Sequence, residues 1–167
     1  MKGKQILAAL ILSVLCLGGT ALDAESETPA TRAQTAVAVW EAAGCPQVNY
    51  AMPFADVPQT LPYAEAVRWC AAEGLMQGYS EAAFGPEDAI TRQQLATMLW
   101  RYMGEPESDG DLSQFKDGAK VSSYAVEAME WAVANGIFQG NSAKMLNPTA
   151  TATRAHIAQV MMNFLEQ

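Results

Sequence analysis

Three arginines stand at corresponding places in the sequence, and they are the residues best suited to bind an anion. Arg32, Arg92 and Arg154 recur at nearly equal intervals, and each directly follows a threonine. The apolar periodicity that follows predicts that each arginine lies in the first turn of a helix. A cation is unfavourable at that end of the helix dipole unless something negative is bound there. A guanidinium together with the free NH groups of a first turn holds a carboxylate or phosphate well.

Two aspartates and two glycines recur at nearly the same interval as the arginines. Asp56 is matched by Asp117 further along the chain, and Gly78 is matched by Gly140. Each aspartate could pair with an arginine and lock one copy to the next, or could serve as a turn or cap residue. Each glycine could let the backbone approach a ligand closely, or could supply a positive φ in a turn. With the arginines, these residues form a recurring set of seven.

The sequence offers little for catalysis or for metal binding. His156 is the only histidine, and the three cysteines are isolated from it and from one another. Neither a metal-ligand spacing nor a Cys-His pair can be drawn from them, and no serine lies in a nucleophile-elbow context. We therefore expect no enzymatic activity, no metal site and no cofactor.

The charge balance argues against whole classes of partner. The chain has 167 residues, with 10 Lys and Arg against 18 Asp and Glu, a formal charge of −8, and half of its residues are apolar. Such a composition is typical of a folded acidic domain and disfavours nucleic acid as a partner. Because the overall charge repels an acidic polymer, any anionic ligand must be held by individually placed cations.

The start of the chain has the pattern of a secretory signal peptide. An apolar run over 6–17 follows two lysines and gives way to small residues, and it is too short to span a membrane. Cleavage after Ala24 fits best, with Ala21 as the alternative. Loss of 1–24, with two lysines and one aspartate, changes the formal charge from −8 to −9. We therefore expect a secreted protein without membrane contact after cleavage.

Two cysteines remain after the signal peptide. Cys45 and Cys70 could form one disulfide in an exported protein. Equally, Cys70 lies in an alanine-rich helical stretch and could be a small buried apolar residue. Both interpretations stay open on the sequence alone.

The sequence repeats itself, which indicates a repeat architecture. The segment 54–57 recurs at 115–118, and the Thr-Arg helix start of the first copy, at 91–92, also occurs upstream at 31–32. Only the second half of a repeat is present at that upstream position. After the signal peptide the chain therefore divides into a partial repeat at 25–53 and two repeats at 54–114 and 115–167.

Each full repeat is predicted to form a helix, an ordered loop and a second helix. The first helices cover about 63–73 and 124–135, and Gly74 and Gly136 are the expected left-handed stops.

The second helices are predicted to begin at Thr31, Thr91 and Thr153, with Gln34 and Gln94 completing capping boxes in the first two. The apolar stripes of these helices cannot be buried within one hairpin, so the repeats must pack on one another. The fold class is therefore all-α, with about five helices. Four tryptophans recur in equivalent pairs and are expected in the core rather than on a sugar face: Trp40, Trp69, Trp100 and Trp131.

Several motifs in a fixed order resemble the S-layer homology repeat. They are a Phe-x-Asp-Val opening, a Gly-x-x-x-Gly step, a Phe-x-Pro anchor and an Ile-Thr-Arg-Ala-Glu-like helix start. The first full copy has Phe54-Ala-Asp-Val57, Gly74-Leu-Met-Gln-Gly78, Phe84-Gly-Pro86 and Ile90-Thr-Arg-Gln-Gln94. The second has Phe115-Lys-Asp-Gly118, Gly136-Ile-Phe-Gln-Gly140, Leu146-Asn-Pro148 and Thr153-Arg-Ala-His156.

This resemblance implies helix-loop-helix repeats packed about a pseudo-threefold axis, with the first repeat truncated here. It also implies ligand grooves between neighbouring repeats that draw on the Thr-Arg dipeptide, the aspartate of the opening motif and nearby glycines. On this chain those are Arg32, Arg92, Arg154, Asp56, Asp117, Gly78 and Gly140. The sequence departs from the family pattern at Gln34, Gln94 and His156, which stand where a glutamate is usual.

Two functions follow as hypotheses. The first is a non-catalytic module at the cell wall or cell surface that attaches non-covalently to an acidic secondary cell-wall polysaccharide, of the pyruvylated kind implied by the resemblance. The alternative is a protein-interaction or dimerisation module at the cell surface. In that case a second copy, or another S-layer homology protein, completes the truncated repeat and covers an apolar face around Ala36, Val37 and Trp40.

Overall fold

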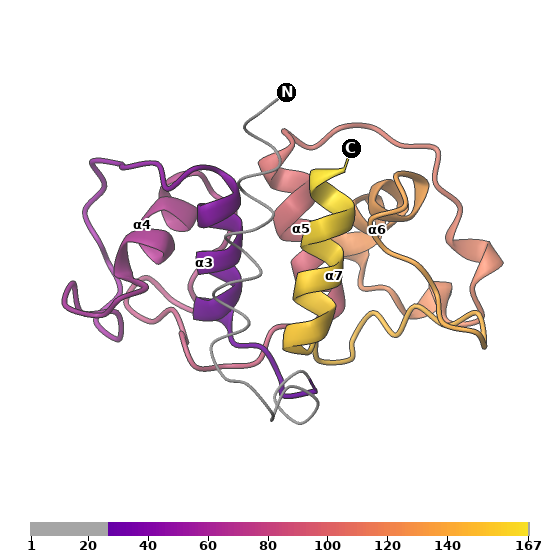
Figure 1. Cartoon of the computed structure of the whole chain (residues 1–167), viewed down its shortest axis with the longest axis horizontal. Helices are drawn as coiled ribbons and strands as arrows, with labels where there is room; N and C mark the ends of the chain where they lie inside the picture. The colour runs from indigo at the N-terminus through magenta and orange to yellow at the C-terminus, as the bar shows by residue number, and fades with distance from the viewer. Residues whose placement is uncertain (1–26, 167) are drawn as a thin grey trace.

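The computed structural model describes residues 27–166. Over that range the chain forms five α-helices and three 3-10 turns, and β-pairing is limited to three isolated bridges (Figure 1). The all-α prediction is therefore confirmed. The predicted signal peptide lies outside the described residues. The elements are α3 (Arg32–Ala42), α4 (Ala64–Ala72), α5 (Arg92–Tyr102), η1 (Leu112–Gln114), η2 (Gly118–Lys120), η3 (Ser123–Ala125), α6 (Val126–Ala134) and α7 (Arg154–Leu165).

The three longest helices begin with the same capping arrangement. The threonines Thr31, Thr91 and Thr153 each accept a hydrogen bond from the NH group three residues on, and the side chain of that residue accepts one in return. Gln34 and Gln94 do so with a carboxamide oxygen, as their spacing predicts. The third capping box was not predicted, because histidine is not among the residue types that complete this motif.

The two shorter helices end where the sequence predicts. Gly74 and Gly136 follow α4 and α6 with φ of +70° and +68°, a conformation that a side chain disfavours. The helix α4 lies within the predicted 63–73. The helix α6 begins two residues later than predicted, because the 3-10 turn η3 occupies its expected first turn.

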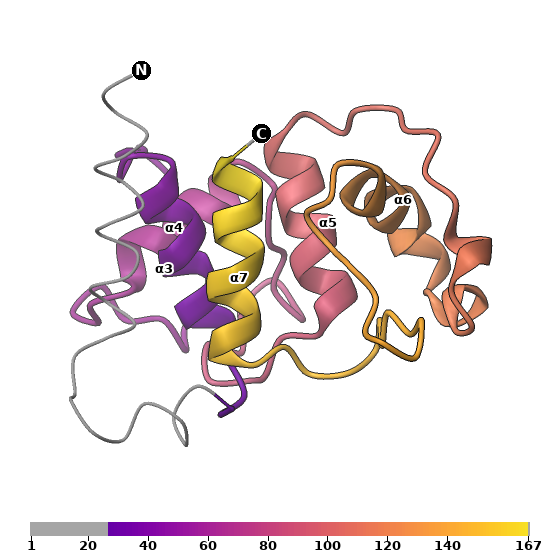
Figure 2. The same cartoon turned by 45° about the vertical axis from the view of Figure 1, so that its right-hand side comes forward.

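Helix packing crosses the boundaries of the sequence repeats. The helix α3 packs on α4, and α5 packs on α6, so the second helix of one repeat covers the first helix of the next. Figures 1 and 2 show these two pairs, with α7 also lying along α3. The apolar stripes are thus buried between repeats, because a single helix pair has no other layer to cover it.

Aromatic side chains connect the helix pairs, with Tyr102 at the surface and the other three rings buried. Trp69 on α4 contacts Tyr102 on α5, whose ring meets Phe164 on α7, and Phe164 in turn contacts Trp131 on α6. The two tryptophans of this series are buried, with 4% and 6% exposure, which agrees with the core prediction. The other two tryptophans, on α3 and α5, are half-buried, and each donates its indole NH to a proline carbonyl later in the chain.

Three backbone segments meet in a closed ring of hydrogen bonds just before the second helices. The NH of Ala30 donates to the carbonyl of Ala152, Ile90 donates to Ala30, and Ala152 donates to Ile90, at 2.8–3.0 Å. The three residues are equivalent in the repeats, and all are buried. The predicted pseudo-threefold axis would pass through this ring, and that axis stays a prediction.

The two cysteines within the described range are unpaired. Cys45 is exposed, and Cys70 is buried on α4 with its Sγ 3.9 Å from the carbonyl of Ala36. These two residues therefore do not form the disulfide that the sequence left open. Burial raises the pKa of the Cys70 thiol well above its ordinary value.

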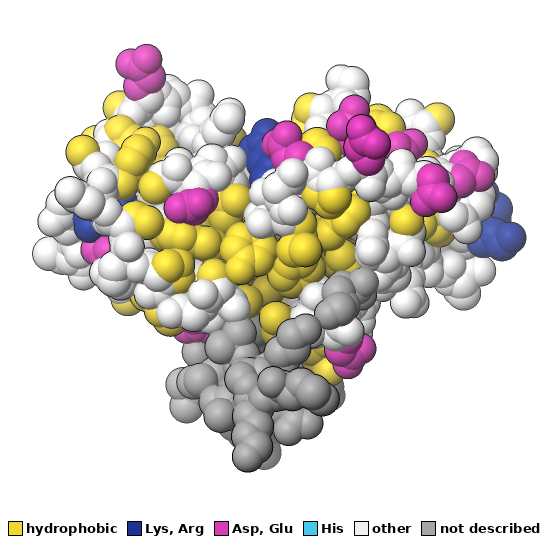
Figure 3. Space-filling view, turned by 90° about the horizontal axis from the view of Figure 1, so that it is seen from above, with side chains coloured by type: hydrophobic (Ala, Val, Ile, Leu, Met, Phe, Trp, Pro, Cys, Tyr) yellow, Lys and Arg dark blue, Asp and Glu magenta, His cyan; other side chains and the backbone are white. Residues whose placement is uncertain are grey.

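The surface in Figure 3 has hydrophobic side chains gathered across the middle of one face, with acidic side chains around them. Of the three residues expected at an open apolar face, Ala36, Val37 and Trp40, the first does not reach the surface. Ala36 is fully buried, and the other two side chains are half-buried against the core. The prediction was wrong at Ala36 because α4 packs directly over α3.

Candidate functional site

Arg92, at the start of α5, reaches the loop that follows α6 in the next repeat. Its Nε donates to the carbonyl of Leu146 at 2.8 Å, and its guanidinium carbon lies 5.2 Å from the centre of the Phe138 ring. Burial lowers the pKa of this guanidinium, and the nearby Asp117 carboxylate opposes that effect. The group keeps its charge at neutral pH because the pKa of arginine is so high.

Asp117 holds the same loop from the other side. Its carboxylate is 2% exposed and accepts hydrogen bonds from the NH groups of Leu146 at 2.8 Å and Asn147 at 2.7 Å. Burial acts to raise the pKa of Asp117, but these backbone hydrogen bonds outweigh it and leave the pKa below its ordinary value. The residue is thus a buried anchor for the loop.

The corresponding residues of the preceding repeat are arranged in the same way. Arg32 donates from Nε to the carbonyl of Phe84 at 3.1 Å and from a terminal nitrogen to that of Gln77 at 2.6 Å. Asp56 accepts from the NH groups of Phe84 and Gly85.

The predicted ion pairs between arginine and aspartate do not form within the described chain. The ion pair found between side chains of residues 27–166 joins Arg68 to Glu65 on α4. Arg32 and Asp56 instead bind the carbonyl and the NH of one residue, Phe84. An arginine therefore connects adjacent repeats through the loop backbone, and the aspartate supports that loop from within its own repeat.

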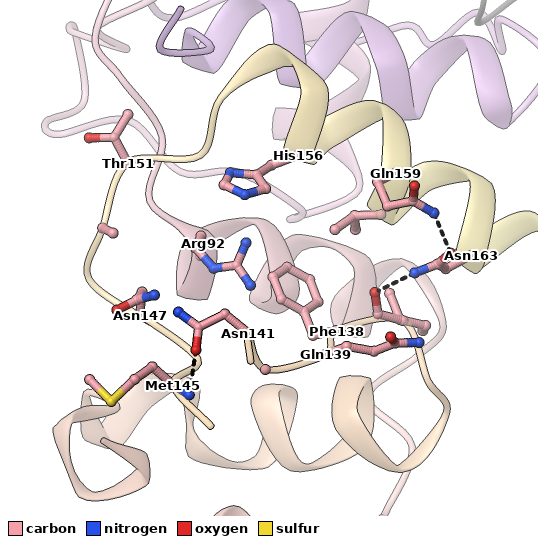
Figure 4. A pocket seen from close by; sticks show the side chains of 14 residues that line it. Arg92, Phe138, Gln139, Asn141, Met145, Asn147, Thr151, His156, Gln159 and Asn163 are labelled. Atoms are coloured by element: carbon pink, nitrogen blue, oxygen red, sulfur yellow. Dashed lines mark hydrogen bonds between the residues drawn. The ribbon is translucent and has the colours of Figure 1, made fainter. Parts of the chain in front are cut away.

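A hollow of about 440 Å³ opens beside Arg92, between the start of α5, the loop after α6 and one side of α7. Figure 4 shows the guanidinium of Arg92 pointing into it, with carboxamides around its wall. None of the fourteen lining residues carries a carboxylate. The carboxamides are those of Gln139, Asn141, Asn147, Gln159 and Asn163.

Several of these amides are held in place by hydrogen bonds. Asn141 accepts from the NH of Met145 at 3.1 Å, and Asn163 accepts from Gln159 and donates to the carbonyl of Ile137. The hollow therefore combines one cation with a set of oriented donors and acceptors. Such a lining suits a polar, hydroxylated ligand that carries an anion.

His156 belongs to both the helix start and the hollow. Its Nδ1 accepts from the NH of Thr153 at 3.3 Å, which closes the third capping box, and its ring faces Arg92 across the hollow in Figure 4. Burial first, and then the positive charge of Arg92, lower the pKa of this imidazole, while Glu27 acts in the opposite direction. The neutral ring is the form that can accept the capping hydrogen bond.

The two candidate glycines are required for packing rather than for a turn. Gly140 lines the hollow, but neither Gly78 nor Gly140 has a positive φ, so that interpretation was wrong. A Cβ on Gly78 would lie 2.5 Å from the ring of Phe54, and one on Gly140 would lie 2.6 Å from the ring of Phe115. The phenylalanine that opens each repeat presses against this step of the backbone, which leaves no room for a side chain.

The seven predicted residues therefore occupy different surroundings. Arg92 and Gly140 meet at the hollow, with Asp117 behind its loop, whereas Arg32, Asp56 and Gly78 surround the equivalent loop of the preceding repeat. Arg154 begins α7, and its backbone NH donates to the carbonyl of Thr28. The carboxamides of the hollow were not predicted. Asn141 and Asn147 have no amide counterpart in the other copy of the loop, and Gln159 and Asn163 reach the hollow from α7, outside the repeated motifs.

Comparison with known proteins decides the family. The S-layer homology domain matches residues 53–96 and 114–158, which together are more than half of the chain. The chain belongs to the S-layer homology family. Both matched segments run from the opening phenylalanine motif into a second helix, so each S-layer homology match contains one of the two loops described above.

Curated relatives carry the same domain within much longer proteins. A surface-layer 125 kDa protein of Lysinibacillus sphaericus is 35% identical over 116 residues, which cover 68% of this chain and 10% of that protein. A cellulosome-anchoring protein of Acetivibrio thermocellus is 27% identical over 149 residues, covering 84% of the chain and 33% of that protein. An endoglucanase of a Bacillus species is 27% identical over 139 residues, which cover 81% of this chain and 15% of that protein.

This S-layer homology chain thus spans a third or less of the length of these relatives. Between residues 27 and 166, no helix is both long enough and apolar enough to cross a bilayer.

Proposed function

We propose that the chain is a non-catalytic cell-wall-binding module that holds an acidic secondary cell-wall polysaccharide in the groove at Arg92. The observation that carries this proposal is the guanidinium of Arg92, which faces a hollow of about 440 Å³ lined by carboxamides and by no carboxylate. A sugar acid, or a sugar with a pyruvyl ketal, supplies one carboxylate for the guanidinium and several hydroxyls for the amides.

The relatives support this proposal by where they act. Their names place them in a surface layer and in the anchoring of cellulosomes, which are roles at the outside of a cell. The endoglucanase matches this chain over only 15% of its own length, so its similarity supports a shared attachment module and not a shared activity. Export by the predicted signal peptide would bring the module to the cell surface, where such polymers occur.

Each groove residue has a defined part in the proposed complex. Arg92 binds the anionic group, and the amides of Asn141 and Asn147 bind neighbouring hydroxyls. Gly140 keeps this stretch of backbone close to the Phe115 ring, which leaves the amides facing the hollow. Asp117 fixes the loop through two backbone hydrogen bonds and does not touch the ligand.

Co-sedimentation with purified bacterial wall sacculi tests the proposal. The chain should sediment with intact sacculi and stay in solution with sacculi stripped of secondary polymer by hydrofluoric acid. Arg92→Ala should lose at least about tenfold in affinity, because a hydrogen-bonded contact to a charged group is worth about 1.5–3 kcal/mol.

Arg101→Ala is the matched control. It removes one positive charge from the same helix, and Arg101 lies in the last turn of α5, away from the hollow lining. This variant should bind intact sacculi like the wild type. Equal binding to stripped and intact sacculi, or equal losses for the two variants, would contradict the proposal.

The alternative of a dimerising module is tested in the same samples. Sedimentation velocity across a range of concentrations should show a monomer that binds intact sacculi. A dimer that ignores the wall preparation would favour the interaction hypothesis.

A further inference from the structure

We infer that, of the two grooves that Arg32 and Arg92 form with the loop of the following repeat, the one at Arg92 is open to a ligand and the one at Arg32 is closed by Tyr79 and Asp88. This inference rests on the proposed function for the identity of the ligand, but the closure itself is a property of the two loops. The internal repeat makes the comparison direct, since the loops that follow Gly78 and Gly140 correspond position by position.

The first difference is the number of partners that each arginine has. Arg32 is 5% exposed, and its guanidinium carbon lies 4.8 Å from the ring centre of Tyr79 and 4.5 Å from that of Phe84. It therefore contacts two aromatic rings, and both Nε and one terminal nitrogen donate to carbonyls. A cation enclosed in this way has little of its charge available to a ligand.

The guanidinium of Arg92 has fewer contacts than that of Arg32. One ring, that of Phe138, lies near its guanidinium, and its Nε donates to one carbonyl. Among the described residues, none accepts a hydrogen bond from either terminal nitrogen of Arg92. Those two nitrogens form the edge of a guanidinium that binds a carboxylate in a bidentate manner.

The second difference is what fills the space in front of each arginine. The position of Tyr79 is taken by Asn141 in the second loop, and the position of Asp88 is taken by Ala150. Asn141 and Ala150 line the open hollow. A large ring and a carboxylate in the first loop are thus replaced by a carboxamide and a methyl group in the second.

The surroundings of Gly85 show that the groove at Arg32 is filled. A Cβ built on Gly85 would collide with the ring of Tyr79 and with the carboxylate of Asp88. The equivalent residue of the second loop is Asn147, which has the same kind of positive φ and yet carries a side chain that lines the hollow. The space occupied by Tyr79 and Asp88 in one groove is therefore open to a side chain and a ligand in the other.

The electrostatics differ in the same sense. Burial lowers the pKa of both guanidinium groups. Among the described residues, the carboxylates of Asp88 and Asp56 oppose this effect on the pKa of Arg32, and the carboxylate of Asp117 opposes it on the pKa of Arg92. An anionic ligand entering the first groove would have to approach the Asp88 carboxylate and displace the Tyr79 ring. Specificity of this kind arises from a repulsive element as well as from attraction.

Arginine labelling tests the closure without any ligand. Phenylglyoxal modifies accessible guanidinium groups, and peptide mass spectrometry resolves the extent at each arginine of the folded protein. Arg92 should be labelled at least about tenfold faster than Arg32, and Tyr79→Asn with Asp88→Ala should remove most of that difference. Equal labelling rates for the two arginines in the wild-type protein would overturn the inference.

Exchange of the loop residues tests the consequence for binding to intact wall sacculi. Asn141→Tyr with Ala150→Asp gives the open groove the residues of the closed one and should weaken binding at least about tenfold. Tyr79→Asn with Asp88→Ala is the matched exchange and should bind at least as well as the wild type. The side chains at all four positions are exposed, and that of Tyr79 is 62% exposed. The protein should therefore fold with either pair of substitutions.

The outcomes separate the two proposals. If the Tyr79 and Asp88 exchange weakens wall binding tenfold, or the Asn141 and Ala150 exchange leaves it unchanged, the inference that the Arg32 groove is closed and the Arg92 groove is open is wrong. If the wild-type protein ignores sacculi while the labelling difference holds, the polysaccharide proposal fails and the closure of the first groove stands.

Discussion

Removing the carboxylate of Asp117 should destabilise the fold more than any other single carboxylate change in the repeats. The side chain is 2% exposed and accepts hydrogen bonds from the NH groups of Leu146 and Asn147 at 2.8 and 2.7 Å. Leu146 is itself fully buried, so water has poor access to its NH once the carboxylate is gone. Asp117→Ala therefore leaves two backbone donors without partners.

The size of the effect follows from the nature of these hydrogen bonds. A hydrogen bond to a charged group contributes about 1.5–3 kcal/mol, and two of them would give roughly 3–6 kcal/mol. Since Asn147 lines an open hollow and water can reach its NH, we expect the lower end, about 3 kcal/mol. For a chain of this size, that corresponds to a fall in Tm of roughly 6–12 °C.

Asp56→Ala provides the internal comparison. Its carboxylate makes the same two kinds of contact, to Phe84 and Gly85, but the side chain is exposed. Water can replace much of what is lost, so about 1 kcal/mol is expected. Asp109→Ala, which removes an exposed carboxylate, should leave stability unchanged.

Urea unfolding followed by circular dichroism at pH 7 measures these differences. The pH dependence gives a second check, because the pKa of Asp117 is lowered in the folded protein. Its contribution is then fully present above the ordinary carboxyl pKa of about 4 and is lost as the pH falls through the lowered folded-state value. Wild type and Asp117→Ala should converge in stability at acidic pH. Equal losses for Asp117→Ala and Asp56→Ala at pH 7 would show that burial of the carboxylate does not set its contribution to stability.

Two further predictions concern a titrating cap and the thiols. His156→Gln should make the protein less sensitive to mild acid. The pKa of His156 is lowered in the folded protein, so the stability of the wild type falls as the pH drops below about 6.5. The difference between the Tm values at pH 5 and pH 7 should therefore be smaller in the variant than in the wild type. Gln94 already fills this capping position in another repeat, so the variant should fold normally. Cys45 should react with a disulfide reagent in the native protein within minutes, whereas Cys70 should react only after addition of urea. Rapid loss of two thiols in the native state would contradict the burial of Cys70.

The local features of the fold could be predicted from the sequence because they depend on neighbouring residues. Thr31 and Thr91 cap their helices through residues three positions on, and Gly74 and Gly136 end helices because their own backbone adopts a positive φ. Each of these signals is complete within one turn of chain. The pairing of helices could not be predicted in the same way. Every helix has a similar apolar stripe, and such a stripe does not specify which other helix packs against it.

The motifs alone were enough to indicate S-layer homology repeats and to show that the arginines recur with aspartates and glycines. The contacts that those residues make depend on the tertiary structure. Arg32 and Arg92 bind backbone carbonyl groups of the following repeat. Every residue has such a carbonyl, so the sequence does not show which one an arginine will bind. Whether the space before each arginine is filled or open depends on how Tyr79 and Asn141 orient in their loops, because side-chain direction is decided by packing between segments that lie far apart in the chain.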